Sequence, residues 1–187
     1  MKRLFKYIFL ILIITFIFDI KASAQDVIIP SGSIIQVYPN KVISTLINQE
    51  GDYVSFVNQS DMWVGEINAI PKNTVFKGHI NFLKMPIKGV NGALSFVIDS
   101  MVFPDRTIQE VNAVVQYKGQ NVIGGDLTPP ASYNYTIHSQ KPIGWFGGIK
   151  GVLQYVPSGE YEQGQHMSVG PKDMLYIIFN EDVELSL

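Results

Sequence analysis

Cysteine is absent from this chain of 187 residues. Disulfide bonds and thiol chemistry are therefore excluded, and no cysteine is available for lipidation. Charged residues make up only 16% of the sequence, against about a quarter in an average soluble protein. Enzyme motifs are missing as well, because the chain has neither a G-x-S-x-G elbow nor a glycine loop in a strand-to-helix setting. The sequence therefore predicts a protein that is not an enzyme and that uses no cofactor.

Histidine is scarce, and the three histidines lie far apart in the sequence, at His79, His138 and His166. None has a second ligand at the spacing of H-x-H or H-E-x-x-H, so we expect no metal site. Asp99 stands among apolar residues, where burial can raise the pKa of a carboxyl group enough for acid or base chemistry. The alternation of apolar and polar neighbours instead favours a position of Asp99 on the solvent-exposed face of a strand.

The N-terminus has the three parts of a secretory signal peptide. Lys2, Arg3 and Lys6 come first, Tyr7–Phe18 is uncharged and mostly aliphatic, and Ala22-Ser23-Ala24 has the form of a cleavage site. The apolar run has about a dozen residues, where a membrane-spanning helix needs about 20. We expect residues 1–24 to be a signal peptide and the protein to reach the periplasm or cell envelope. The alternative is an N-terminal membrane anchor that is retained.

Cleavage of this segment changes the charge of the protein. It removes four of the 14 basic residues and one of the 16 acidic residues, which leaves a net charge of −5. Proteins that bind nucleic acid need a basic face to neutralise phosphates. A nucleic-acid partner is therefore not expected.

Residues 25–187 show the two-residue period of half-buried strands. In 75–82 the apolar face includes Phe82, and in 94–102 it includes Val102, with Met101 on the opposite face. A third such segment covers 111–117. The run 174–179 is apolar on both faces and is expected to be central, and no segment has a helical stripe. The sequence predicts one all-β domain, a partly open barrel or sandwich of about six to nine strands.

Four prolines each precede a predicted strand by a few residues. They are Pro30, Pro71, Pro104 and Pro171. Proline presets φ for the second position of a type I turn, and the residue two places after it then favours the left-handed region. Glycine enters that region freely, and Asn and Asp tolerate it. The residues at this place are Gly32, Asn73, Arg106 and Asp173, of which Arg106 fits least well, and we predict positive φ at Gly32 and Asn73.

Residues 118–170 interrupt the strand pattern before the last strand. This segment is polar and rich in turns, apart from a glycine-containing apolar stretch at 143–156. We expect a loop-rich insertion without strands of its own, and long loops of this kind often carry function.

The insertion gathers aromatic residues that are candidates for binding. Trp145 and Phe146 stand between glycines, and Tyr133, Tyr135 and Tyr155 flank them. Three interpretations remain open: the aromatic side chains close the end of the barrel, they contact a membrane surface or a partner protein, or they stack on sugars.

Three stretches carry a family resemblance. They are 29–35, with Ile-Pro-Ser-Gly-Ser, then 70–78, with Ile-Pro-Lys-Asn-Thr, and the closing 173–185 after the glycine-rich stretch. This pattern resembles the C-terminal β-barrel domain of TrbI-type proteins of conjugation and type IV secretion. Asn73 stands where the pattern has glycine, and 143–156 is too short to span a bilayer as a helix.

The resemblance implies a non-catalytic exported envelope protein, a subunit or accessory of a secretion, conjugation or surface assembly. Its partners would be envelope proteins or further copies of itself, with contact to a membrane surface as another option. The alternative function is a binding module for cell-wall glycan or a small ligand, which would use the aromatic residues of the insertion.

Overall fold

The computed structural model describes residues 26–128, 130–139 and 151–186, and in these residues the protein is all-β. No helix that could cross a membrane occurs in that part of the chain. The predicted fold class is confirmed, and the core is a closed barrel with one additional strand.

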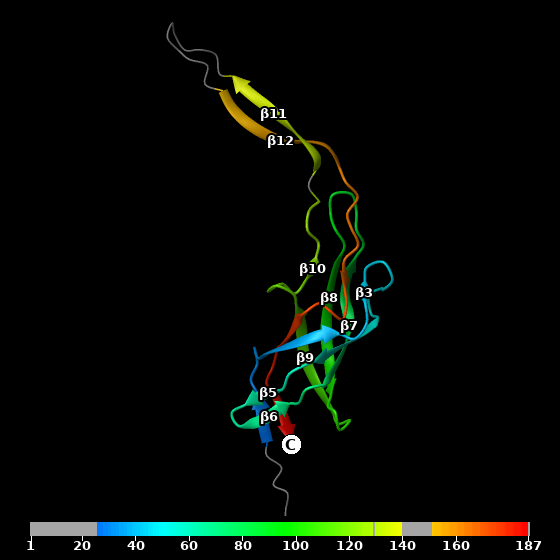
Figure 1. Ribbon diagram of the computed structural model, residues 1–187, viewed down its shortest axis with the longest axis vertical. Helices are drawn as coiled ribbons and strands as arrows, with labels where there is room; N and C mark the ends of the chain where they lie inside the picture. The colour runs from blue at the N-terminus through cyan, green and yellow to red at the C-terminus, as the bar shows by residue number, and fades with distance from the viewer. Residues whose placement is uncertain (1–25, 129, 140–150, 187) are drawn as a thin grey trace, which may run out of the picture.

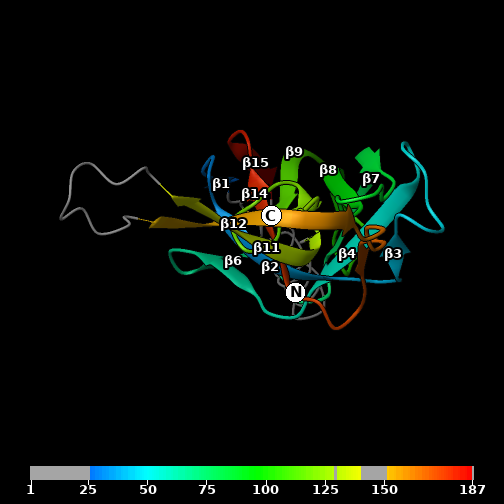
Figure 2. The ribbon, with the colours of Figure 1, turned by 90° about the horizontal axis from the view of Figure 1, so that it is seen from above.

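Six strands form the barrel (Figure 1). In ring order they are β8 (Ala93–Val102), β7 (Val75–Lys84), β4 (Tyr53–Asn58), β2 (Ile34–Pro39), β14 (Leu175–Phe179) and β9 (Ile108–Gln116). The ring closes because β9 pairs with β8 from Val97–Val114 to Val102–Ile108, as well as with β14. The additional strand β10 (Ile123–Gly124) continues along the first residues of β8. Viewed from above, the six strands follow one another around the ring (Figure 2).

Side chains from the barrel wall fill its interior. Phe56, Phe76, Phe96 and Phe179 are fully buried, and the rings of Phe56 and Phe96 meet edge to face with centroids 5.5 Å apart. On β9 the inward residues are those predicted from the sequence, Val111, Ala113 and Val115. The run predicted to be central is β14, which pairs on both sides, with β2 and with β9. The barrel is therefore a packed core and not a channel.

Two bulges change which residues face this core. The register of β7 against β8 shifts between Ile80 and Phe82, and that of β8 against β9 shifts between Ile98 and Ser100. An extra residue in one strand reverses the face of every residue that follows it. Phe82, which the sequence places inside, is accordingly 39% exposed. Met101 is fully buried in place of Val102, so the predicted assignment of these two residues is wrong.

The end of the barrel opposite the hairpin of β11 (Pro130–Ser139) and β12 (Gly151–Tyr161) carries two small sheets. They are β1 (Asp26–Ile29) with β15 (Val183–Ser186), and β5 (Met62–Val64) with β6 (Ile67–Ile70). Buried residues from both join the main core, namely Val27, Ile29, Ala69, Ile70, Val183 and Leu185. The first and last described strands of the chain are thereby paired with each other at this end (Figure 1).

The proline turns have the predicted left-handed residues but two different geometries. Gly32 and Asn73 have φ of 81° and 68°, with the predicted sign. The Ser33 N–H donates to the Pro30 carbonyl, and the Thr74 N–H donates to the Pro71 carbonyl. Proline is therefore the first residue of these two turns and not the second, and the left-handed residue is the third, as type II turns require.

The other two turns place proline second, as predicted. The Arg106 N–H donates to the Phe103 carbonyl at 2.9 Å, and Arg106, the fourth residue of that turn, has φ of 76°. Hydrogen bonds from the Thr107 N–H and hydroxyl hold the pKa of the Asp105 carboxyl below its usual range. The Asp173 backbone does not have positive φ, contrary to the expectation that it fits the left-handed region. The carboxylate of Asp173 instead accepts the Gly170 N–H at 2.7 Å.

The insertion contains more strand than the sequence suggested. Besides β10 it holds β11 (Pro130–Ser139), β12 (Gly151–Tyr161) and β13 (Ser168–Val169). The last of these pairs with β3 (Ile43–Ser44). The expectation of an insertion without strands is therefore wrong. The predicted signal peptide, residues 1–24, lies outside the described residues.

Removal of a core ring tests the barrel packing. Phe96→Ala should lower the free energy of unfolding by about 3–5 kcal/mol, because it deletes a fully buried ring and its contact with Phe56. Phe82→Ala, on the neighbouring strand but past the bulge, should lower it by less than about 1 kcal/mol. Urea unfolding of both variants measures this, and equal losses would contradict the bulge assignment.

The turn geometries predict opposite responses to glycine. Arg106→Gly should stabilise the protein by up to about 1 kcal/mol, since an L-residue is disfavoured in the left-handed region. Asp173→Gly should destabilise it, because the residue has no left-handed strain to relieve and its carboxylate bond to Gly170 is lost. Thermal melting of the two variants gives the signs, and a shift in the same direction for both would refute the assignment.

Candidate interaction site

The longest hairpin of the insertion leaves the barrel. β11 and β12 project from the end of the barrel where β10 lies (Figure 1). Their register runs from Pro130–Tyr161 to Ser139–Gly151, with one irregularity between Pro130 and Ser132. Within the described residues, each of these two strands pairs only with the other. The hairpin is thus a two-stranded ribbon that extends beyond the folded core.

The register of the hairpin sorts its residues by polarity. Alternate register pairs contain only aromatic, aliphatic or proline residues: Tyr133–Pro157, Tyr135–Tyr155 and Ile137–Leu153. The two pairs between them and the next pair toward the end of β11 each contain a polar residue: Asn134–Val156, Thr136–Gln154 and His138–Val152. This two-residue period is typical of an amphipathic ribbon. Residues 130–139 and 151–159 include no Lys, Arg, Asp or Glu.

Three of the five predicted aromatic candidates lie in this hairpin. Tyr133 and Tyr135 belong to β11 and Tyr155 to β12, and the register makes Tyr135 and Tyr155 direct partners. Trp145 and Phe146 lie outside the described residues, in 140–150. The sequence thus identified the aromatic residues of this segment but not the strands that align three of them.

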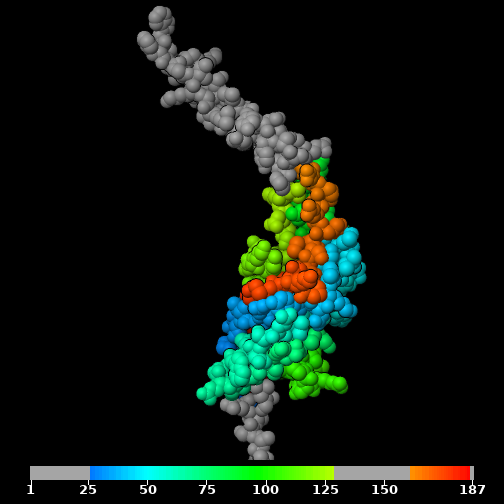
Figure 3. Space-filling model, viewed as in Figure 1, coloured from blue at the N-terminus to red at the C-terminus, as the bar shows by residue number. Residues whose placement is uncertain are grey.

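Three chain segments hold the base of the hairpin, and we call them the collar. They are the loop 85–92 between β7 and β8, the segment 125–128 that leads to β11, and the segment 161–165 that begins at the last residue of β12. The loop lies between the other two, since the Thr128 N–H donates to the Gly89 carbonyl at 2.8 Å and the Gly89 N–H donates to the Glu162 carbonyl at 2.9 Å. Figure 3 shows the segment after β12, in orange, running along this end of the barrel.

Side chains and glycines tighten the collar. The Asn91 side-chain oxygen accepts the Gln165 N–H at 2.8 Å, and the Thr128 hydroxyl lies 3.5 Å from the same oxygen, so one amide links both legs of the hairpin. The Gly164 N–H donates to the Ile87 carbonyl at 3.1 Å. A side chain at Gly164 would overlap with the Val90 carbonyl, so only glycine allows this approach. The legs of the hairpin are therefore fixed to the barrel.

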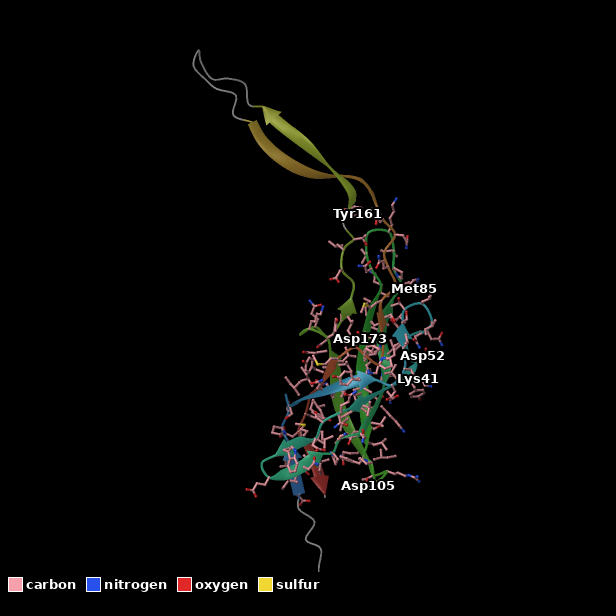
Figure 4. The ribbon with its side chains drawn as sticks, in the orientation of Figure 1. Lys41, Asp52, Met85, Asp105, Tyr161 and Asp173 are labelled. Atoms are coloured by element: carbon pink, nitrogen blue, oxygen red, sulfur yellow. The ribbon has the colours of Figure 1, made fainter. Side chains whose placement is uncertain are left out.

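Large apolar side chains are exposed around the collar. They are Met85, Ile87, Leu127, which is 77% exposed, and Tyr161. Figure 4 shows Met85 and Tyr161 at the hairpin end of the barrel and Asp105 at the opposite end. Exposed apolar groups on a protein surface can mark an interaction site. The collar therefore has exposed apolar side chains at the base of the hairpin.

Among the side chains that the structure describes, the titratable groups do not converge on one site. His79 Nδ1 lies 2.9 Å from an Asp99 carboxylate oxygen on the outside of the barrel, where Asp99 is the extra residue of a bulge, and His166 contacts the Thr45 hydroxyl. Asp99 thus lies on the solvent-exposed face of β8, as the sequence indicated. No group of three or more metal-ligating side chains occurs among the described residues.

Two further carboxyl groups have lowered pKa values, and both lie in surface turns. The pKa of Asp52 is lowered by hydrogen bonds from the Asn48 side chain and the Gln49 N–H. The pKa of Asp61 is lowered by hydrogen bonds from the Lys72 N–H and the Asn68 side chain. These bonds order the turns in which they occur.

The fold of the chain is similar to that of known structures. No family model and no curated protein matches the chain. The chain is similar to ComB10 of the Com type IV secretion system of Helicobacter pylori, with a TM-score of 0.48 and 12% identity over 83% of this chain and 88% of that one. That protein is of the type IV secretion class to which the sequence resemblance pointed. At this level of similarity the likeness concerns the fold alone.

A glycine substitution tests the collar. Gly164→Ala should lower the free energy of unfolding by about 1–3 kcal/mol and speed hydrogen exchange at Gly89 and Thr128, because the new methyl group pushes the loop carbonyl away. Gly170→Ala is the matched control, since its methyl group would meet only ordinary contacts with Val42 and Asp173. Exchange rates unchanged in both variants would show that the collar tolerates the methyl group and is not tightly packed.

Proposed function

We propose that this protein is a non-catalytic exported component of the cell envelope, a subunit or accessory of a secretion, conjugation or surface assembly. The β11–β12 hairpin is its contact with the rest of that assembly. The observation that carries the proposal is a closed barrel that holds, through a bonded collar, a long hairpin with alternating apolar register and no Lys, Arg, Asp or Glu in 130–139 and 151–159.

The hairpin is not needed to complete the barrel. The ring of six strands closes without it, and β11 and β12 contact mainly each other. A lone two-stranded hairpin is at best marginally stable in water, so its apolar positions call for a further surface. A partner in an assembly supplies such a surface, which supports a structural role over a catalytic one.

Export rests on the N-terminal sequence and on the resemblance to TrbI-type domains. The basic start, the short apolar run and the Ala22-Ser23-Ala24 site support secretion. The resemblance supports a place in the periplasm or cell envelope. A stable barrel that needs no disulfide suits an exported domain of this size.

Removal of the hairpin tests the proposal. Because Pro130 and Tyr161 are register partners, residues 131–160 can be replaced by an Asn-Gly turn without moving the collar. The variant should melt within a few degrees of the parent, since the barrel is intact, yet it should leave the high-mass fraction of detergent-solubilised envelopes. Density-gradient sedimentation of the solubilised envelopes measures this.

The matched control is a change at the opposite end of the barrel. Trp63 in β5 is 58% exposed, and Trp63→Ser should leave sedimentation unchanged. Persistence of the hairpin-deleted variant in the high-mass fraction would refute the hairpin as the contact. Recovery of the full chain from the cytosol would refute the envelope role.

The alternative function, binding of cell-wall glycan, is favoured by the three tyrosines of the hairpin. Tyrosine rings can stack on sugar faces, and Tyr135 and Tyr155 are direct register partners. This alternative predicts that the mature chain sediments with purified peptidoglycan and that Tyr135→Ala with Tyr155→Ala abolishes this. The assembly role predicts that the chain stays in the supernatant.

A further inference from the structure

We infer that the β11–β12 hairpin pairs edge to edge with the same hairpin of further copies of this chain, the β12 edge of one copy against the β11 edge of the next. This inference specifies the partner of the contact proposed above and rests on that proposal. The occupant is a second copy of the chain, and the contact is a continued antiparallel sheet.

Both long edges of the ribbon are open within the described residues. β11 has 10 residues and β12 has 11, and each pairs on one side only. Along such an edge, alternate residues present backbone N–H and carbonyl groups that can extend a sheet. Pro130 and Pro157 interrupt the edges only near the collar. The stretches 132–139 and 151–156 are therefore free of proline and able to pair.

The absence of charge favours an identical copy as the occupant. Edge strands in soluble proteins are usually protected by charged residues, above all lysine, which oppose pairing between copies. Identical strands placed side by side would also bring like charges together. The two stretches contain no Lys, Arg, Asp or Glu, so neither obstacle is present.

The geometry of the ribbon favours head-to-tail pairing. The two edges have nearly equal length, and β12 runs antiparallel to β11. When copies stand side by side in the same orientation, the β12 edge of one copy therefore also runs antiparallel to the β11 edge of the next. The alternation of polar and apolar register pairs then continues from copy to copy. Pairing of β12 with β12 would instead leave both β11 edges open, whereas the head-to-tail contact can cover every edge with a single kind of contact.

The native chain contains no cysteine, so cysteine pairs introduced into the full chain report this contact directly. Two differently tagged forms are produced in the same cells, one carrying Thr136→Cys and the other Val152→Cys, Gln154→Cys or Val156→Cys. These three partner positions cover register shifts of two residues, which keep the same face. The expected result is a mixed disulfide dimer with at least one partner, in about tenfold excess over dimers from either variant alone.

Two controls make every outcome decisive. A chain with both Thr136→Cys and Gln154→Cys should close an internal disulfide, because these residues are register partners, which shows that the hairpin forms. Ile108→Cys, exposed on β9, should give no mixed dimer with Gln154→Cys. Formation of the internal disulfide with no mixed dimer at any of the three positions would overturn the inference.

Cell fractionation and vesicle binding separate the remaining outcomes. Envelope-bound chain that forms no mixed dimer would overturn the edge pairing and leave the proposed function intact, whereas cytosolic chain would overturn both. Monomeric chain that floats with vesicles of phosphatidylethanolamine and phosphatidylglycerol would assign the hairpin to a lipid surface, against the inference. Mixed dimers in the envelope fraction support it.

Discussion

The pairing of β9 with β8 is the constraint on which the rest of the structure depends. It joins the last free edge of the six-stranded sheet to the first, so the wall has no open side. A closed wall satisfies the backbone of each strand and buries one face of all six around the four central phenylalanines. The remaining small sheets have strands of two to four residues, which are too short to act as templates for pairing. Against this background the β11–β12 hairpin is the exception within the described residues, since it alone keeps long edges open.

Much of the barrel could be predicted from the sequence, because a two-residue period of apolar residues allows few structures other than a half-buried strand. Val111, Ala113 and Val115 show this, since their alternation is unbroken and all three are buried. The bulges could not be predicted. Near Asp99 the residues are apolar at both parities, so Met101 and Val102 were equally good core residues until the register shift decided between them. Only the partner strand fixes where an extra residue is inserted.

The hairpin was missed for a different reason. Tyr-Asn-Tyr-Thr-Ile at 133–137 already alternates, but prolines and glycines around it gave the stronger signal, that of turns. The collar carries no local signal, because its glycines and Asn91 matter only through contacts with segments far away in the sequence. Positive φ at Gly32 and Asn73 was predictable because a turn is local. The position of proline in the turn could not be predicted, because it depends on which backbone carbonyl accepts the hydrogen bond that closes the turn.

The rigid collar fixes the orientation of the unpaired strand edges of the hairpin. A ribbon with open edges on a flexible tether would meet other copies in every orientation, and disordered aggregation would compete with any defined assembly. The collar removes that freedom, because Gly89 and Asn91 bond to both legs and so relate the direction of the hairpin to the barrel wall. Copies that approach with their barrels side by side then present their edges in one relative orientation. The same physical requirement, that no long strand edge stays unpaired, closes the barrel within one chain and, by our inference, closes the hairpins between chains.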